Sequence, residues 1–395
     1  MPGGVHVRHR AGPRRVVTIG VDHDGPRTPV IGIDGSRLSV CHQTGTERYT
    51  DRLLRAVAAL EPPERLRVYL NADCAPDNLA PGLDPRPIPW PRLWTQLRLS
   101  WEMVQRRPTV LFVPAHVIPV VHPRSVVTIH DLGYLTEPAA HTSRSRWQLD
   151  RSTRWNARVA RLIIVPSEAT ARDLVERYQT PAERIRVIPH GVDPPDDPLP
   201  PAAIDAVRQR TGLPPHFILF VGTVQPRKNI AALATAMHAV AAAGLPHHLV
   251  VVGQRGWMAD KVEAAVCTSG IADRVHWAGF VDDADLPAVY QAASAFSLPS
   301  LHEGFGFPAL EAMSYGVPTV LGNRSALPEI GGDAALLVDP LSIPELGTAL
   351  VRVLTDRPLI DRLQRAGPLR ASGYRWKRTA ERTLAVLREA IDGPI

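Results

Sequence analysis

Cysteine is scarce in this 395-residue sequence, and long apolar runs are absent. Its three cysteines lie far apart and match neither a metal-binding spacing nor a disulfide framework, so a reducing cytoplasm is the expected environment. The longest apolar run, residues 110–121, is interrupted by Pro114, His116 and Pro119 and is too short to span a bilayer. Residues 1–29 are basic but lack the apolar segment of a secretory signal, and we expect them to form a disordered leader.

Lysine is absent from the first 192 residues, which contain 27 arginines and 18 acidic residues. This half therefore carries an excess of nine positive charges. One explanation of this arginine excess is a genome that prefers arginine codons, and we favour this explanation. The other is a basic N-terminal domain that faces an anionic partner, such as a phosphorylated acceptor or, by peripheral contact, a membrane surface. Nucleic acid is not an expected partner, because the arginines are scattered and not interleaved with aromatic residues.

Short apolar segments alternate with helical ones along the chain, which predicts parallel βαβ units. Strands are expected at residues 30–33, 66–70, 110–113, 125–129, 162–165, 185–188, 217–221, 248–252, 275–277, 295–298, 319–321 and 335–338. Helices are expected at residues 49–60, 94–104, 168–178, 230–243, 258–268, 285–292, 309–314, 343–354 and 379–391.

The proline-rich segment 189–201 can be neither a long helix nor a central strand, and we expect the domain boundary there. The α/β pattern predicts two doubly wound, Rossmann-like domains, residues 30–192 and 193–372, which face each other across a cleft at the carboxyl ends of their strands. Residues 373–395 then form a last helix after an aromatic hinge at 374–376.

Residues 303–311 combine a glycine-rich turn with a glutamate at each end. Pro308 suits the first turn of a helix that Gly316 ends, so free backbone amides in this turn form an anion site. Gly304 and Gly306 allow a ligand to approach the main chain closely. We interpret the segment as a ligand site, because a turn used only for packing does not require two carboxylates.

Glu303 and Glu311 are not a glycosidase pair by their spacing. Retaining hydrolases place their two carboxyl groups about 5 Å apart. Eight residues of helix separate Cα atoms by about 12 Å. Two separate contacts on one elongated ligand fit this spacing better.

A second anion site is expected after the strand 217–221. The loop from Gly222 to Asn229 places Arg227 and Lys228 at the start of the next helix. Cations are disfavoured at a helix N-terminus unless an anion compensates them, and two adjacent cations suit a diphosphate. In the first half, His130 and Asp131 lie at the carboxyl tip of a strand that faces the predicted cleft, which favours a functional role for both.

Two other segments have competing interpretations. Residues 282–285 resemble a metal-binding run of carboxylates, but they fit a turn and helix N-cap better. The helix 92–107 could lie on a membrane, but we favour a core-facing amphipathic helix. Its apolar positions are Trp94, Leu97, Trp101 and Val104.

Taken together, these segments resemble the retaining GT-B glycosyltransferases of family four, especially the bacterial mannosyltransferase-like group 1 branch. The resemblance runs from about Ile31 to the C-terminus. Its most specific parts are residues 303–311, which match the family's motif of two glutamates separated by seven residues, and residues 227–229. Supporting segments are 126–132, 164–168, 189–193 and 323–329.

The resemblance implies a role for each candidate residue. Arg227 and Lys228 would hold the nucleotide diphosphate, Glu303 the hydroxyls of the donor sugar and Glu311 those of the ribose. His130 would approach the donor sugar, and the last helix would cross back onto the first domain. The remaining donor-side residues are Gly222, Val281, whose backbone would hold the base, and Gly304, Phe305, Gly306, Phe307 and Leu310, whose amides would reach the sugar and phosphates.

The family transfers with retention, and the leaving phosphate can take the acceptor proton, so neither a cofactor nor a metal ion is expected. GDP-mannose is the first expectation for the donor, ahead of UDP- and dTDP-sugars. The acceptor stays open among glycans, lipid-linked glycans and small natural products. The acceptor side would include Gly45, Glu47 and Asp131. Glu47 stands near the position of a second glycine in the family, where it either caps a helix or recognises the acceptor.

Three alternative functions remain to be weighed. A phosphorylase of this architecture needs a lysine for pyridoxal phosphate, and none of the three lysines is suited to that role. An epimerase would lack the two-glutamate motif. A non-catalytic nucleotide-sugar-binding subunit would bind the donor without forming product, but the presence of both glutamates and both cations favours an enzyme.

Overall fold

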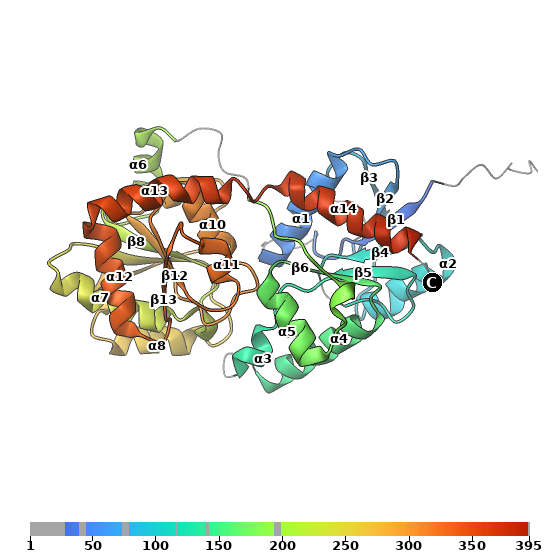
Figure 1. The fold of residues 1–395 in the computed structure, drawn as a ribbon, viewed down its shortest axis with the longest axis horizontal. Helices are drawn as coiled ribbons and strands as arrows, with labels where there is room; N and C mark the ends of the chain where they lie inside the picture. The colour runs from blue at the N-terminus through green and yellow to red at the C-terminus, as the bar shows by residue number, and fades with distance from the viewer. Residues whose placement is uncertain are drawn as a thin grey trace, which may run out of the picture.

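The computed structural model describes residues 28–38, 45–72, 79–115, 117–138, 142–192 and 199–393. Of the predicted leader, residues 1–27 lie outside these ranges. Two parallel sheets lie side by side in an elongated molecule, each covered by helices (Figure 1). This is the predicted pair of doubly wound sheets. The boundaries at residues 192/193 and 372/373 stay predictions, and residues 193–198 lie outside the described ranges.

The first sheet has seven parallel strands in the order β3-β2-β1-β4-β5-β6-β7. Their bounds are β1 Val30–Asp34, β2 Arg65–Leu70, β3 Leu83–Pro87, β4 Val110–Val113, β5 Arg124–Thr128, β6 Leu162–Val165 and β7 Ile185–Val187. The central strand β4 is buried at all four positions, as expected when helices cover both faces of a parallel sheet. Strand β3 was not predicted, because its sequence Leu-Asp-Pro-Arg-Pro has no apolar run; its two prolines are tolerated at the sheet edge.

The second sheet has six parallel strands in the order β10-β9-β8-β11-β12-β13. Their bounds are β8 Phe217–Val221, β9 His248–Val252, β10 Val275–Gly279, β11 Ala295–Leu298, β12 Thr319–Gly322 and β13 Leu336–Val338. All six lie within two residues of their predicted positions. Apolar runs such as Phe-Ile-Leu-Phe-Val in β8 mark the buried strands directly.

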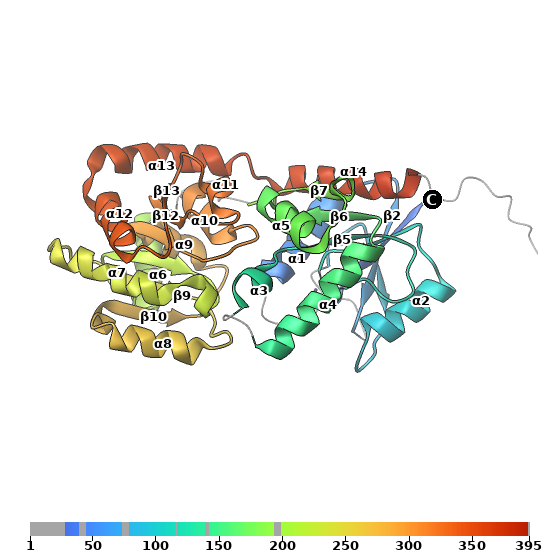
Figure 2. The ribbon, with the colours of Figure 1, turned by 60° about the horizontal axis from the view of Figure 1, so that its bottom comes forward.

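Helices cover both sheets (Figure 2). In the first half they are α1 Gly45–Ala58, the π-helix η1 Thr95–Leu99, α2 Ser100–Gln105, α3 Gly133–Thr136, α4 Ser143–Val159, α5 Glu168–Tyr178 and the 3-10 turn η3 Ala182–Arg184. In the second half they are α6 Pro201–Arg210, η4 Pro226–Lys228, α7 Ile230–Ala242, α8 Ala259–Thr268, η5 Ala272–Arg274, α9 Leu286–Ala292, α10 Phe307–Ser314, α11 Leu327–Gly331, α12 Ile343–Thr355, α13 Arg357–Ala371 and α14 Trp376–Asp392. Among the described residues, none of these helices is both long and apolar enough to cross a membrane.

The core-facing interpretation of residues 92–107 is wrong for three of its four apolar positions. Trp94 is buried, whereas Leu97, Trp101 and Val104 are exposed. The π-turn η1 has a longer period than an α-helix, and it shifts the buried stripe onto Trp94, Leu99 and Met103. An i, i+3, i+7 pattern read as one α-helix therefore assigned the wrong face to the core.

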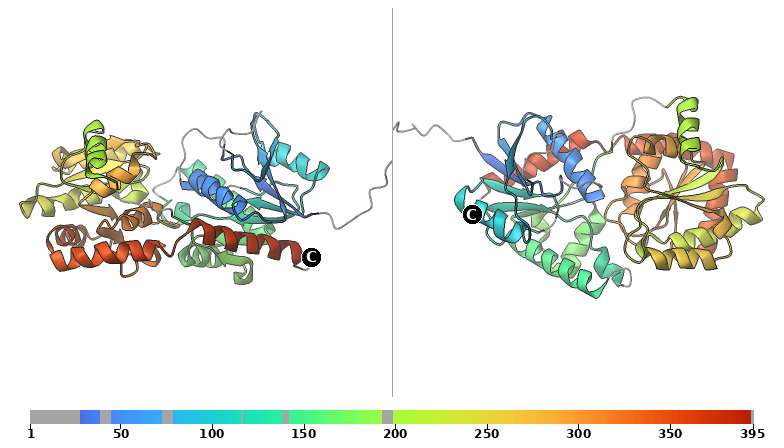
Figure 3. Two further views of the ribbon diagram at one scale, coloured as in Figure 1. Left: turned by 90° about the horizontal axis from the view of Figure 1, so that it is seen from above. Right: turned by 180° about the vertical axis from the view of Figure 1, so that it is seen from behind.

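Helix α14 packs on the first sheet, although it follows directly from α13 on the second (Figure 3). Trp376, Leu384 and Leu387 join the core that includes Tyr49 and Leu53 of α1. Arg388 also donates to both oxygens of Glu64, at 2.7 and 3.0 Å. This confirms that the C-terminal helix crosses back, so the last residues of the chain tie its two halves together.

Replacing Trp376 tests how much this crossing contributes to stability. Its ring is buried where α14 begins, and its backbone nitrogen would lie 2.3 Å from a Cβ at Gly191. We expect Trp376→Ala to lower the free energy of unfolding by about 3–5 kcal/mol, because it leaves a cavity that cannot collapse. Urea denaturation measures the change. The control Lys377→Ala, at an exposed position, should stay within about 0.5 kcal/mol of the wild type; equal stability of both variants would contradict this role.

Candidate functional site

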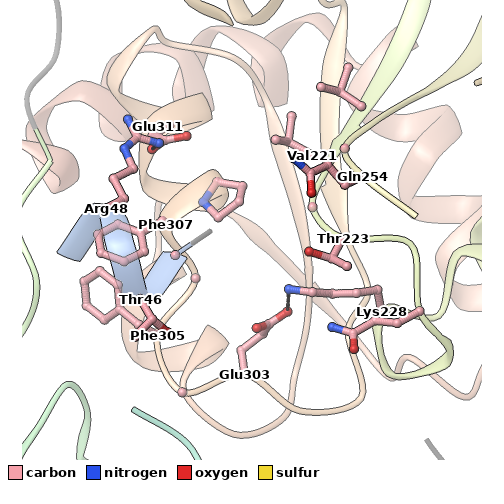
Figure 4. Close-up of a pocket in the computed structure, with 18 of the residues that line it drawn as sticks. Thr46, Arg48, Val221, Thr223, Lys228, Gln254, Glu303, Phe305, Phe307 and Glu311 are labelled. Carbon is pink, nitrogen blue, oxygen red and sulfur yellow. Dashed lines mark hydrogen bonds and ion pairs between the residues drawn. The ribbon is translucent and has the colours of Figure 1, made fainter. Parts of the chain in front are cut away.

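A pocket of about 550 Å³ opens where the carboxyl ends of the two sheets face each other (Figure 4). Residues from both halves of the chain line it. The first half contributes Gly45, Thr46, Arg48, His130, Asp131 and His190. From the second half, Gly222, Arg227, Lys228, Val281, Glu303, Gly304, Phe305, Gly306, Phe307 and Glu311 are among the lining residues. Thirteen of the fifteen site residues expected from the sequence thus meet in one cavity; the two outside it are Glu47 and Leu310.

The glycine-rich turn enters helix α10 as its sequence predicts. Gly306 is the N-cap with a φ of +117°, which suits glycine, and Gly316 follows the helix end with a φ of +71°. The amides of Gly304, Phe305 and Gly306 donate to no acceptor among the residues that the structure describes. They are therefore available to an anion in the pocket.

The anion site is shorter at its C-terminal end than the sequence suggested. The amide of Leu310 donates to the carbonyl of Gly306 at 3.3 Å, and its side chain is completely buried in the core. The expectation that this amide reaches the donor is corrected accordingly, because the first helical turn uses it.

Gly304 also packs against the first half of the chain. A Cβ built on it would lie 1.8 Å from the carbonyl oxygen of His130, and Ser167 donates its hydroxyl to the Gly304 carbonyl at 2.8 Å. Only glycine fits so close an approach of two backbones. The turn that offers free amides is therefore also the place where the two halves touch.

Arg227 and Lys228 lie in the 3-10 turn η4, next to the pocket. The Lys228 Nζ is 2.6 Å from Glu303 Oε1, and Arg227 lies 3.5 Å from Glu303 Oε2 and 4.0 Å from Asp131 Oδ2. From the sequence we expected an anion beside these cations. In the structure two carboxylates of the protein compensate them, so their position alone does not require a ligand.

The charges of this cluster hold one another ionised. Burial acts to raise the pKa of Glu303, but Lys228 and Arg227 together lower it below its usual value. Burial likewise opposes ionisation of Asp131, yet Arg227 and His302 lower its pKa to about 2. Both carboxylates are therefore negative at neutral pH, and the site pairs two cations with two anions.

Glu311, at the other end of the pocket, has two partners that sequence reasoning missed. Arg48 of α1 lies 2.6 Å from Glu311 Oε1, and the Tyr290 hydroxyl donates to Oε2 at 2.7 Å. Arg48 comes from the opposite half of the chain, so this ion pair bridges the pocket. In the sequence, the one local feature that pointed to this ion pair was a cationic side chain one helical turn after Gly45. That feature does not predict a partner so distant in the sequence.

His130 and His190 form an aromatic cluster on one wall. The Nε2 of His130 lies 2.9 Å from the carbonyl oxygen of Pro114, and burial lowers its pKa. Burial, reinforced by His130, lowers the pKa of His190 well below its usual value. The His190 ring stacks on Phe307, with centroids 5.0 Å apart. Both imidazoles are therefore neutral at neutral pH. His190 was not among the predicted site residues, although it lies in one of the supporting segments.

Glu47 lies beside the pocket and does not line it. It is buried in the first turn of α1, and its Oε1 accepts from Arg37 at 2.9 Å. Its two expected roles, capping the helix and recognising the acceptor, stay predictions. Because Arg37 pairs with it, its charge is compensated within its own half of the chain.

No group of three or more His, Cys, Asp or Glu side chains that could hold a metal ion occurs among the described residues. Asp285 is the N-cap residue of α9, as predicted, but its side chain makes no capping hydrogen bond. Its Oδ1 instead pairs with Arg210 at 2.6 Å.

Two family descriptions match the chain. Residues 44–195 match the model described as Glycosyltransferase Family 4, and residues 215–356 match the model described as Glycosyl transferases group 1. The O-antigen chain mannosyltransferase B of Escherichia coli is 28% identical over 361 residues, which cover 86% of this chain and 95% of that protein. The 2-deoxystreptamine glucosyltransferase of Streptomyces kanamyceticus is 34% identical over 208 residues, or 51% of this chain and 54% of that protein.

Solved structures resemble the chain over nearly its whole length. Sucrose-phosphate synthase from Thermosynechococcus elongatus superposes with a TM-score of 0.72 at 21% identity, covering 93% of this chain and 100% of that chain. Anabaena HepE in complex with UDP-glucose also has a TM-score of 0.72, at 19% identity, covering 91% and 99%. At these identities the likeness establishes a shared fold.

Substituting Gly304 tests whether the close approach at the pocket matters for activity. We expect Gly304→Ala to lower kcat/KM by about 10²-fold, because the added Cβ must displace either the turn or the tip of strand β5. The matched control is Gly373→Ala, whose Cβ would meet its nearest neighbour at an acceptable 3.4 Å. Steady-state kinetics with both variants checks this, and full activity of Gly304→Ala would contradict it.

Proposed function

Because this chain belongs to the retaining glycosyltransferases of family 4, enzymes with the GT-B fold that use nucleotide sugars, we propose that it moves a hexosyl group from GDP-mannose to an acceptor hydroxyl. The observation that carries this proposal is the cluster of Arg227, Lys228 and Glu303 beside three free amides, with Glu311 farther along the same pocket. Cations and amides suit a diphosphate, and carboxylates suit the hydroxyls of the sugar and the ribose on either side of it.

In the proposed arrangement the diphosphate binds between the two cations and the turn that begins α10. Lys228 then exchanges part of its contact with Glu303 for a phosphate oxygen. Glu303 is left with free acceptor capacity for the hydroxyls of the donor sugar. The ion pair keeps both side chains in place, so little reorganisation is needed when the donor binds.

At the ribose end, Glu311 keeps unused lone pairs although Arg48 and Tyr290 each contact one of its oxygens. These lone pairs can accept two ribose hydroxyls. The ion pair with Arg48 fixes the orientation of the Glu311 carboxylate. We propose that the backbone near Val281, which also lines the pocket, borders the nucleotide base.

The chemical step is dissociation of the bond between the sugar and the phosphate, with attack of the acceptor on the same face. Negative charge builds on the leaving phosphate, and Arg227 and Lys228 stabilise it. The acceptor hydroxyl passes its proton to that phosphate, so no protein base is needed. His130, neutral and fixed by its contact with the Pro114 carbonyl, would border the donor sugar without donating a proton. Gly45 and Asp131 lie on the acceptor side of the pocket in this scheme.

The donor and acceptor rest on the relatives. The mannosyltransferase from E. coli matches nearly the whole chain, which supports mannose as the sugar of the donor. The 2-deoxystreptamine glucosyltransferase supports the alternative of a glucosyl donor and a small-molecule acceptor, but it matches over only about half of each chain. Glycan, lipid-linked and small-molecule acceptors stay open, and the cytoplasm stays the predicted location. A membrane contact is a separate proposal, because it rests on surface residues away from this pocket.

Removing either cation tests the proposed mechanism. We expect Arg227→Ala and Lys228→Ala each to lower kcat by about 10²–10³-fold, because each deletes a preorganised contact to the charge that develops on the diphosphate. Lys261→Ala, an exposed lysine of α8, is the matched control. Lys228→Gln retains a hydrogen-bond donor toward Glu303 and should therefore fold. A loss of turnover in this variant then reports lost catalysis and not lost folding. Turnover like that of the wild type in folded Arg227 and Lys228 variants would contradict the mechanism.

A thermal-shift and product screen tests the donor and the alternative of a binding subunit. A donor at about 100 times its Kd adds about 2.7 kcal/mol to the stability, so the preferred nucleotide sugar should raise Tm most. We expect the largest shift with GDP-mannose, compared with UDP-glucose and dTDP-glucose. A larger shift with either of these would favour the alternative donor. A shift with neither hydrolysis nor transfer in the presence of glycan acceptors would favour a non-catalytic subunit.

A further inference from the structure

A row of large apolar side chains is exposed along the segment that contains η1 and α2. Five of them have between 46% and 69% of their surface exposed: Trp90, Leu93, Leu97, Trp101 and Val104. The last four all lie on the solvent side of the segment, whereas Trp94, Leu99 and Met103 face the core. Scattered single apolar residues are ordinary on a protein surface, but a contiguous row marks an interaction site.

The neighbouring loop extends this row. Val120 and Val121 are also exposed, and the Val121 amide donates to the hydroxyl of Ser100 in α2 at 3.3 Å. That hydrogen bond places the two valines beside the helix. We call these seven residues the apolar ridge.

The charge along the ridge is positive. Arg92, Arg106 and Arg107 are exposed and have no carboxylate partner among the residues that the structure describes. The acidic residue of α2, Glu102, is buried and is neutralised by Arg86 at 3.2 Å and Arg98 at 3.1 Å. The ridge is thus an apolar stripe bordered by uncompensated cations.

A basic pocket of about 680 Å³ adjoins the ridge. Four arginines line it, together with His122: Arg107, Arg124, Arg161 and Arg184. Arg107 lies three residues beyond Val104, and His122 directly follows Val121, so both join the pocket to the ridge. Of the two acidic lining residues, Glu389 is paired with Arg186, which leaves Glu183 against four arginines.

Arg161 and Arg184 of this pocket lie close enough to repel each other. Burial lowers the pKa of the Arg184 guanidinium, the charge of Glu183 opposes this shift, and the charge of Arg161 adds to it. Arg124 is held in place by donating to the carbonyl of Ile391 near the end of α14, and Arg184 by donating to that of Ala160. Like charges fixed side by side favour binding of an anion between them.

We propose that the apolar ridge and the basic pocket form one membrane-binding surface, in which the ridge enters the interface of a bilayer and the pocket takes the phosphate of an anionic phospholipid. Tryptophan and leucine with flanking arginine are suited to the boundary between headgroups and acyl chains. A second copy of the chain fits this surface less well, because each copy would bring the same uncompensated arginines to the contact.

The location of the surface agrees with anchoring rather than with acceptor binding. Helix α2 and the C-terminal end of α14 both lie at the outer end of the first half, away from the second sheet, and they pack on opposite faces of the first sheet (Figures 1 and 2). The basic pocket is at the amino ends of β5 and β6, whereas the donor pocket is at the carboxyl ends of the strands. A bilayer bound here leaves the donor pocket open.

Co-sedimentation of the full chain with vesicles tests the proposal. We expect binding to vesicles of phosphatidylcholine mixed with phosphatidylglycerol, much weaker binding to phosphatidylcholine alone, and weakening by salt. Leu97→Asp with Trp101→Asp should weaken binding more than about tenfold, because two exposed apolar side chains no longer enter the interface. Arg107→Gln with Arg161→Gln should weaken it about fivefold per arginine on the anionic vesicles alone.

The matched control is Leu341→Asp with Leu369→Asp, two leucines on the second half of the chain that are more exposed than Leu97 and Trp101, and this variant should bind as the wild type does. Donor hydrolysis without vesicles should be unchanged in the Leu97/Trp101 variant, since these residues lie outside the donor pocket. The proposal is overturned if the wild type does not bind anionic vesicles, or if the Leu97/Trp101 variant binds them equally well. It is also overturned if sedimentation velocity shows a dimer that the same two substitutions abolish, because a second copy would then cover the ridge.

Discussion

The buried contact between Lys228 and Glu303 is the interaction around which the donor pocket is organised. Two cations and two carboxylates meet where the two halves of the chain face each other, and removing any one of them leaves an uncompensated charge in a desolvated place. The protein's own carboxylates neutralise its cations. A diphosphate can therefore enter a site whose donors are already in position, provided that it competes with Glu303 for Lys228.

This arrangement depends on contacts between the halves. Gly304 touches His130 and accepts from Ser167, and Arg48 reaches across to Glu311. Behind the pocket, the carboxylate of Glu329 accepts the amides of Glu168 and Ala169 at 2.8 and 2.7 Å, so the second half caps the N-terminus of α5 in the first. Two of the sequence segments that supported the family resemblance meet at this cap. Helix α14 packs on the first half and follows directly from α13 on the second, so the chain itself also connects the two halves here.

The sequence predicted those strands, turns and helix ends that are marked by a short run of neighbouring residues. Buried strands such as β8 appear as short apolar runs, and the turn at Gly306 and the helix end at Gly316 follow from glycine and proline chemistry. Edge strand β3, rich in proline, and helix α4, which buries three residues, had no such run or stripe. The exposed side of η1 and α2 was misassigned because a π-turn changes the period of the helix.

What the sequence could not supply was pairing across the cleft. Arg48 and Glu311 are partners only because two independently wound sheets are docked in one orientation. A crystal structure with a nucleoside diphosphate is the sharpest test of this donor site. We expect the diphosphate between Arg227, Lys228 and the amides that follow Glu303, with the ribose hydroxyls on Glu311. A nucleotide bound elsewhere, with the Lys228–Glu303 and Arg48–Glu311 contacts unchanged, would contradict it.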